Sequence, residues 1–329
     1  FDVKNGVVQS FSLPPVYRAD QAMNQKIWEH QVIQKQISEI QVKAMVTRLF
    51  YDILLSQKKL ALLREQELAF AEFFRIAELR HQKGESDLLE LQHTKLIRQK
   101  IRIAIQACIS DIQAEKDHLR FLMNDQTTFE VVNDDLKYLP GNLEQNLDEH
   151  PLVLSIQKRL SIQSAKNYLE KMKKLPEISA GYVFQTFRTP GEISSAGPIL
   201  SYGVLSFNLP LFNKSINKRM AAFSLESKAI DVQKNEALEM LKLKQRQLNH
   251  KRAKYDAQVI QYEKEILPST ESMKLLVALK FKNGSLDYLE WIQSMQEIFD
   301  SDLAYLHCIR ERNQLLIQQQ YLTNEYATE

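Results

Sequence analysis

Histidine, cysteine and carboxylate side chains are the groups in this sequence that could do chemistry. The seven histidines are scattered, and no two of them lie four residues apart with a third ligand nearby. Cys108 and Cys308 form no CxxC motif and show no metal-ligand spacing. Carboxylates are numerous, but no nucleophile elbow, phosphate-binding loop or zinc motif accompanies them. The sequence therefore predicts no enzyme, no bound metal and no cofactor.

Two histidines and the two cysteines have alternative interpretations. His81 and His93 lie on either side of Gly84 and could contact a metal ion, but a solvated helix face is the favoured interpretation. Cys108 lies in an apolar row, where a free cysteine packs as a small hydrophobe. Cys308 occupies the equivalent place 200 residues later (308 minus 108). Equivalent positions need not be neighbours, so we expect free thiols rather than a disulfide.

The amino-acid composition indicates which secondary-structure elements position these groups. Gly occurs only 8 times and Pro 9 times in 329 residues, so few turns are available and the elements must be long. Charged residues make up 26% of the chain with a net charge of +2, which gives no basic field for nucleic acid. No apolar run of about 18 residues is present, so no transmembrane α-helix is predicted. Because the chain starts at Phe1, we interpret it as a mature chain or a fragment.

Two stretches without helix breakers predict very long helices. No Pro or Gly lies between Pro14 and Gly84 other than Pro15, and only Pro268 interrupts the stretch between Pro210 and Gly284. As continuous helix, each stretch of about 70 residues would be roughly 100 Å long. A three-to-four-residue apolar rhythm supports helix on both sides of the first tip. It is carried by Ile33, Ile37, Ile40 and Ala44, and then by Ile101, Ile105, Cys108, Ile112, Leu119 and Leu122, with Glu115 as a polar interruption.

Strands are predicted at the other end of the helices. Val7, Phe11 and Leu13 lie on one side of a strand that ends at Pro14, although Gln9 breaks the alternation. Residues 178–187 alternate clearly, and residues 202–209 continue after a slip of one, which predicts a β-bulge. Pro14 and Pro210 each end a strand and open a helix, where a missing N–H costs least. We also expect a break at 125–147 with a possible short strand at 129–132, and a helix at 151–174.

An internal repeat organises the chain. Pro14 and Pro210 differ by 196, whereas Gly84 and Gly284 differ by 200, so the second copy is four residues longer. Four residues are about one helical turn, which leaves the apolar face nearly in place. We predict a mainly α fold with a small β part, in two repeats of one structural domain. The first repeat spans 1–147; the second spans 148–329, with a strand pair at 177–209 and a helical hairpin at 214–326. Counterparts of 151–187 would precede Phe1.

The order of strand, proline junction, long helix, glycine tip and return helix, given twice, resembles the TolC-like family of outer-membrane efflux proteins. The matching motifs are Leu-Pro-Leu-Phe at 209–212 and the two tips with the pattern GxxDxLE, at 84–90 and 284–290. The resemblance covers nearly the whole chain. The strand at 181–185 and the Phe-containing strand before Pro14 also look similar to members that work with heavy-metal pumps of the resistance-nodulation-division class.

The resemblance implies an outer-membrane channel with a periplasmic extension. Three protomers would form a homotrimer, with a transmembrane β-barrel in the outer-membrane lipid and a coiled-coil tunnel in the periplasm of a Gram-negative bacterium. A closed barrel is the only sheet that satisfies its backbone groups in lipid. The partners would be a periplasmic adaptor (membrane fusion protein) and an inner-membrane pump, so that the channel is a passive exit duct for small molecules or metal ions. Nucleic acid is not an expected partner.

The resemblance also assigns roles to residues at the tips. The expected adaptor contacts are Lys83, Gly84, Glu85, Asn283, Gly284 and Ser285. The expected entrance constriction uses Glu90 and Glu290, whose symmetry copies would form a ring that favours cations; these carboxylates could equally be ordinary solvated charges. Phe281 and Leu286 stand where some members have Tyr and Arg, which puts a polar lock of the entrance in doubt.

Two alternative functions stay open on the sequence. A type I secretion exit duct would share the same fold, because the inner-membrane partner decides the cargo. A soluble coiled-coil scaffold or adaptor protein is the other alternative. An adaptor, however, has one hairpin between Gly-rich β domains, and a scaffold does not need the strands at 177–209.

Overall fold

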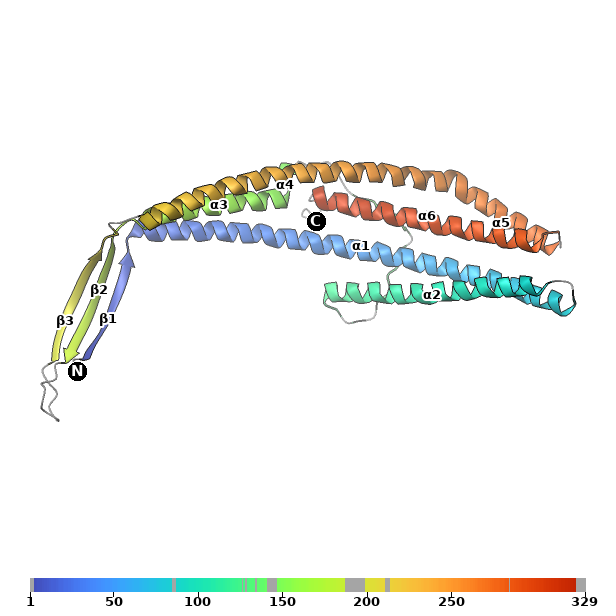
Figure 1. The fold of residues 1–329 in the computed structure, drawn as a ribbon, viewed down its shortest axis with the longest axis horizontal. Helices are drawn as coiled ribbons and strands as arrows, with labels where there is room; N and C mark the ends of the chain where they lie inside the picture. The colour runs from blue at the N-terminus through green and yellow to red at the C-terminus, as the bar shows by residue number, and fades with distance from the viewer. Residues whose placement is uncertain are drawn as a thin grey trace, which may run out of the picture. The chain divides into compact units, whose positions relative to one another are not determined.

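The computed structural model describes residues 3–84, 87–125, 127, 129–133, 135–140, 147–186, 199–210, 214–283 and 285–323. Helices and a small sheet make up the fold, as predicted (Figure 1). The chain packs into two compact units, Phe1–Ile37 with Asp148–Met240, and Ser38–Leu147 with Leu241–Glu329. Neither unit coincides with a predicted repeat, and the division into two repeats stays a prediction. No helix of the described residues has the length and hydropathy needed to cross a membrane.

The sheet of the first unit has three antiparallel strands in the order β1-β2-β3 (Figure 1). They are β1 (Val3–Ser12), β2 (Glu177–Thr186) and β3 (Ile199–Asn208), each of ten residues. The predicted bulge is wrong, because the pairing of β2 with β3 is unbroken from Glu177↔Asn208 to Thr186↔Ile199. Val204 and Leu205 are apolar neighbours that occupy opposite faces of a regular strand, so the apparent slip reflects composition and not geometry.

The two faces of the sheet differ in chemistry. In register, Val7 pairs with Tyr182, Asn5 with Phe184, and Phe11 with Ile178, which in turn pairs with Phe207. The face that carries these residues is aromatic and apolar, and its exposed members are Val7, Phe11, Tyr182, Phe184, Leu205 and Phe207. The opposite face is richer in small polar residues, among them Ser10, Ser12, Ser179, Gln185 and Ser206. One face of the sheet is therefore suited to an apolar environment, and the other is suited to water.

Two glycines let β1 and β2 approach on the polar face. A Cβ at Gly181 would lie 2.7 Å from both the Val7 carbonyl oxygen and Val8 Cγ2. A Cβ at Gly6 would lie 2.8 Å from Val183 Cγ2, and Val183 is buried. Both distances are below van der Waals contact, so a side chain at either position would push the strands apart.

The helices of the first unit join through ion pairs and an apolar stripe. They are α3 (Pro151–Met172), the first part of α1 (Pro14–Gln82) and the first part of α4 (Lys214–Gln261). Lys158 Nζ donates to Glu29 Oε2 at 2.7 Å, which links α3 to α1. Arg219 Nε donates to Glu170 Oε2 at 2.8 Å, which links α4 to α3. Ile33 and Ile37 are buried on α1, as the apolar rhythm predicts.

Two helical hairpins and the last part of α4 form the second unit. The remainder of α1 returns as α2 (Leu88–Met123), and α5 (Leu267–Lys282) returns as α6 (Tyr288–Thr323) (Figure 1). Helices thus lie on both sides of each predicted tip. Apolar clusters pack between these helices and the end of α4, and the cluster next to the tips is aromatic. Both cysteines are buried free thiols within these clusters or next to them, so no disulfide forms.

The second long helix is not a single α-helix. After α4 comes a π-helical turn, Tyr262–Ile266, labelled η2, which leads directly into α5. The Leu267 N–H donates to the Tyr262 carbonyl, five residues back, instead of four. Pro268 follows at the start of α5 and has no N–H to donate to the preceding turn. The predicted continuous helix is therefore interrupted by a widened turn at the one proline in the stretch.

The break after α2 contains no strand in its described residues. Asn124 takes a left-handed conformation (φ 51°) and ends α2, and a 3-10 turn (Leu147–Glu149) precedes α3. The predicted short strand at 129–132 is wrong, because residues 129–133 have no strand partner. Instead, Phe129 and Val131 pack on Leu49 and Leu119 as an extended cover of the core. An alternating pattern fits such a cover as well as it fits a strand.

Candidate functional site

The first tip is a tight turn with a left-handed glycine. The Lys83 N–H donates to the Leu79 carbonyl at 3.2 Å, and the Gly84 N–H donates to the His81 carbonyl at 2.9 Å. Gly84 has φ +73°, and a Cβ there would meet nothing within 4 Å. The position therefore needs glycine for its backbone and not for space. Lys83 and Gly84 are exposed, and Glu85 lies outside the described residues.

The second tip is held by a polar side chain. Asn283 ends α5 with its N–H bonded to the Leu279 carbonyl at 3.1 Å. Ser285 donates both its N–H (3.0 Å) and its hydroxyl (3.2 Å) to the Lys280 carbonyl. Asn283 and Ser285 are exposed, whereas Gly284 lies outside the described residues. Both predicted tips thus lie where the hairpins turn, and their described residues Lys83, Asn283 and Ser285 are polar and exposed.

The two hairpins are joined just behind their tips. The Tyr288 hydroxyl on α6 donates to the Glu90 carbonyl on α2 at 2.7 Å and lies 3.2 Å from Thr94 Oγ1. Phe73 of α1 stacks on Trp291 of α6, with ring centroids 3.8 Å apart and planes at 6°. Aromatic contacts of this kind are worth about 0.5–1.5 kcal/mol beyond their buried area. The joint was not predicted, although the aromatic residues at 70–74 and 288–291 were its signal.

Phe281 and Leu286 belong to this aromatic joint. Both are half-buried and pack on the cluster that contains Phe70, Phe73 and Trp291. The Phe281 ring lies 5.5 Å from that of Phe73 and 5.8 Å from that of Trp291. The residues that stand in place of a polar lock therefore make apolar packing contacts within one chain.

The two carboxylates predicted for the constriction have different environments. Glu90 is half-buried, and burial raises the pKa of its carboxyl, with Asp287 and Asp87 adding to the shift and Arg80 opposing it. Its carboxylate lies 3.7 Å from the Arg80 guanidinium. Glu290 is exposed at the start of α6. The assignment of both residues to a constriction stays a prediction, because it concerns a ring of several chains.

The two proline junctions lie where a strand gives way to the following segment, and the histidines are not gathered into a metal site among the described residues. Pro14 begins α1, and the Val16 N–H donates to the Leu13 carbonyl at 2.9 Å, which closes the first turn. Pro210 follows β3, and residues 211–213 after it lie outside the described residues. The His93 ring lies edge-on to Tyr288, with centroids 6.3 Å apart. Within the described ranges, no group of three or more His, Cys, Asp or Glu side chains could hold a metal ion.

A polar network crosses the second unit along the apolar seam. The Arg310 guanidinium on α6 donates to Asp52 Oδ1 on α1 and to Glu115 Oε1 on α2, both at 2.8 Å. Gln314 donates a further bond to Asp52 Oδ1 at 3.2 Å. Burial raises the pKa of Glu115, and Arg310 opposes that shift. The sequence marked Glu115 as an interruption of the seam, but its partners on α1 and α6 were not predicted.

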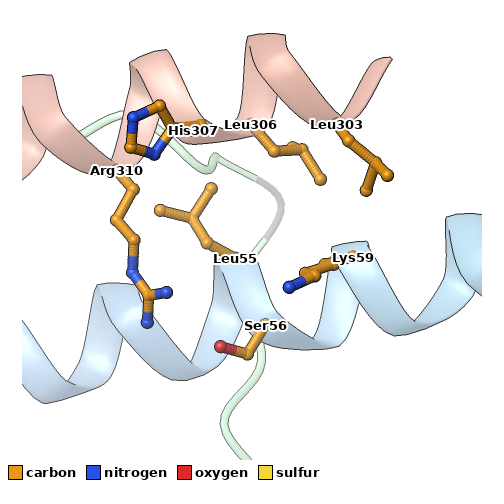
Figure 2. Close-up of a pocket in the computed structure, with 7 residues that line it drawn as sticks. All are labelled: Leu55, Ser56, Lys59, Leu303, Leu306, His307 and Arg310. Atoms are coloured by element: carbon orange, nitrogen blue, oxygen red, sulfur yellow. The ribbon is translucent and has the colours of Figure 1, made fainter. Parts of the chain in front are cut away.

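This network borders a hollow of about 230 Å³ between α1 and α6. Figure 2 shows Arg310 extending from α6 toward α1, with His307 beside it and Lys59 and Ser56 on the α1 side. Three leucines, Leu55, Leu303 and Leu306, complete the lining. Because two carboxylates already neutralise Arg310, the hollow carries no strong net charge of its own. The Arg310 network beside the hollow therefore connects α6 to α1 and α2.

Solved structures of outer-membrane proteins share this fold. The chain is similar to the Campylobacter jejuni CmeC outer membrane channel (TM-score 0.77, 13% identity, covering 98% of this chain and 71% of that one). It is equally similar to the open state of the Neisseria gonorrhoeae MtrE outer membrane channel (TM-score 0.76, 13% identity, 98% and 80%). The chain has the fold of the TolC-like outer-membrane channels.

A third similar structure is CusC, which is described as forming a transmembrane channel (TM-score 0.74, 13% identity, covering 98% of this chain and 83% of that one). Neither a protein-family model nor a curated protein matches the sequence. The fold expected from the glycine tips, the proline junctions and the breaker-free helices is therefore confirmed by structure and not by overall sequence similarity.

Proposed function

We propose that this chain is one protomer of a homotrimeric outer-membrane channel that serves as the exit duct of a tripartite efflux system. Its partners would be a periplasmic adaptor and an inner-membrane pump of the resistance-nodulation-division class. The observation that carries the proposal is the shared fold with proteins described as outer membrane channels, over 98% of this chain. The cargo would be small molecules or metal ions.

The chemistry of the sheet supports a place in the outer membrane. Phe11, Tyr182, Leu205 and Phe207 are each at least half exposed on the aromatic face. In water, exposed apolar groups of this size are unfavourable, whereas in a lipid-facing strand they are favourable. The serines of the other face suit a water-filled interior. Strands of ten residues have the length that spans a bilayer when tilted.

Electron microscopy of the full-length protein in detergent tests the channel. We expect a hollow trimer with a helical tube joined to a short barrel. An elongated monomer or dimer that stays in solution without detergent would contradict the proposal and favour the scaffold alternative.

The tips are the proposed adaptor contacts. We propose that Lys83, Gly84 and Glu85 of one hairpin, and Asn283, Gly284 and Ser285 of the other, meet the adaptor. The open space around Gly84 supports this, because a side chain there would protrude outward, although any residue other than glycine strains the backbone at φ +73°. Gly84→Leu and Gly284→Leu should reduce crosslinking to the adaptor and reduce resistance. Gly84→Asn is the matched control, because Asn tolerates the left-handed backbone. Unchanged crosslinking in both leucine variants would remove this contact.

The proposed constriction has a separate test. Glu290 is exposed in the single chain. A residue that contacts its symmetry copies only in a trimer would be exposed in this way. If Glu290 and Glu90 contribute to a ring of carboxylates, Glu290→Gln should lower the cation selectivity of channels in planar bilayers. An unaltered reversal potential would argue that these carboxylates are ordinary solvated charges.

A further inference from the structure

The second unit contains a concentration of positive charge that the proposed duct does not require. Residues 242–254 of α4 include six Lys or Arg and no Asp or Glu, although the whole chain has a net charge of only +2. Like charges on neighbouring turns of a helix repel one another and destabilise it. Arg252 of this run is paired with Asp256 at 3.2 Å, so the charge that matters here is that of the lysines without such a partner.

Part of this charge lines a groove. Lys244, Lys251 and Lys254 lie along one side of α4 and, with Glu311 of α6, surround a hollow of about 240 Å³. Lys251 lies seven residues after Lys244, within about 20° of the same helix face, whereas Lys254 is rotated from Lys244 by about 80° toward the other edge of the groove. They are spread over about 15 Å of helix axis at 1.5 Å a residue. Such a row fits an elongated ligand better than a compact one.

The lysines of the groove lack carboxylate partners. Among the described residues, no carboxylate oxygen lies within 4.0 Å of the ammonium nitrogens of Lys244, Lys251 and Lys254. Nearby acidic residues are already paired: Asp256 accepts from Arg252 at 3.2 Å and from Arg312 at 2.8 Å. Glu311 is thus the single negative side chain in the lining, against three positive ones.

The rest of the lining suits a polar ligand on an apolar floor. Leu248 and Leu315 are buried beneath the groove. Gln247 and Gln318 offer amide donors and Tyr255 offers a hydroxyl, whereas the Gln314 amide already donates to Asp52. The hollow beside Arg310 is a useful contrast, because its guanidinium contacts two carboxylates at 2.8 Å and no excess charge remains. The α4 groove combines space, hydrogen-bond donors and three lysines without a carboxylate partner among the described residues.

We propose that this groove binds an elongated, multiply charged oxyanion, such as a linear phosphate ester or polycarboxylate. The ammonium groups would each donate charge-assisted hydrogen bonds to successive anionic groups along the ligand. Glu311 opposes binding and limits the affinity. The site lies within the second unit and does not depend on the tips or on the sheet.

Isothermal titration of the full-length protein in a non-ionic detergent with inorganic tripolyphosphate tests the proposal. We expect binding that weakens with salt and falls in the order tripolyphosphate, pyrophosphate, phosphate. Lys244→Gln/Lys251→Gln/Lys254→Gln should weaken tripolyphosphate binding by about tenfold or more, since several charge-assisted bonds are lost. Glu311→Gln should strengthen it a few-fold by removing the opposing charge.

The matched control removes three positive charges elsewhere. Lys58, Lys218 and Lys228 are exposed and lie outside the groove, so Lys58→Gln/Lys218→Gln/Lys228→Gln changes the net charge equally. Retained binding in this control, with loss in the groove variant, supports the site. An equal loss in both variants, or no binding to the unmodified protein, overturns it. So does a groove variant that only weakens the oligomer, which would mean that carboxylates of a second copy cover the lysines.

Discussion

At the residue scale, the half-buried Glu90 lies close to Arg80 and to two aspartates. Its surroundings raise the pKa of its carboxyl, because burial and the nearby Asp287 and Asp87 outweigh Arg80. A carboxyl whose folded pKa is raised adds stability that is complete below its unfolded pKa and is lost as the pH rises through the folded pKa. At neutral pH the charged form of Glu90 is therefore a small cost to the fold.

Glu90→Gln should remove this cost. We expect the variant to be more stable than the unmodified protein at pH 7, by less than about 1 kcal/mol because Glu90 is only partly shielded from water. The difference should vanish as the pH falls below the ordinary range of a glutamate. Thermal denaturation of the detergent-solubilised protein between pH 4 and pH 8 measures it. A variant that is less stable at pH 7 would show that the Arg80 contact dominates.

Arg310 is the residue on which the polar network depends. Arg310→Gln leaves Glu115 without its cation and Asp52 with only the Arg48 contact at 3.4 Å, and the side chains of Asp52 and Glu115 are only 9% and 21% exposed. Removing one partner of a fully buried pair costs about 3–5 kcal/mol, and the partly exposed guanidinium lowers this expectation to about 2–4 kcal/mol. The loss should shrink from pH 7 to pH 5, because Glu115 can take up a proton more readily when Arg310 is gone.

The control for Arg310 is a surface pair. Arg75 donates to Glu72 at 2.7 Å, but both side chains are more than half exposed, so Arg75→Gln should cost almost nothing. Denaturation midpoints of the two variants, measured at pH 5 and at pH 7, compare them directly. Similar small losses in both would mean that the network contributes no more than an ordinary surface ion pair.

At the element scale, the absence of Pro and Gly determined most of what could be predicted. The first long helix, the hairpin tips and the return helices follow from that absence and from the apolar rhythm, because both are local properties. The polar network and the aromatic joint could not be predicted, since they depend on which helices meet. Phe129 and Val131 show the same limit: their alternation fits a strand, but no strand lies beside them.

The widened turn at 262–266 could not be predicted from the sequence either, although Pro268 lies two residues after it. A π turn typically accommodates one extra residue without rotating the helices on either side. Lys264 is exposed in the middle of this turn, while Glu263 accepts a bond from the Tyr305 hydroxyl at 2.6 Å. The extra residue can therefore be removed without losing packed side chains.

Deletion of Lys264 should convert the π turn into regular helix. We expect unchanged helical content by circular dichroism and a denaturation midpoint close to that of the unmodified protein. Deletion of Ala253, an exposed residue in regular helix, is the control. It rotates every following residue by about 100° and should strongly destabilise the protein. Equal damage from both deletions would show that the widened turn is itself required.

At the scale of the whole molecule, the two faces of the sheet differ in the environment they would contact in the proposed channel. Leu205 and Ser206 are neighbours on β3, and both are exposed, yet they lie on opposite faces. If the aromatic face meets lipid, a lysine on that face must leave its charge in hydrocarbon, which costs about 2–4 kcal/mol near the bilayer centre. The same lysine on the serine face would point to water and cost little.

We therefore expect Leu205→Lys to reduce the amount of assembled protein in the outer-membrane fraction, and Ser206→Lys to leave it nearly unchanged. Membrane fractionation followed by electrophoresis without heating measures both the location and the oligomer. The comparison is matched, because the two variants add the same side chain to adjacent positions of one strand. Equal tolerance of both would mean that neither face is buried in lipid. A reversed result would place the serine face outward, which the exposed Phe11, Tyr182 and Phe207 argue against, because they would then line a water-filled interior.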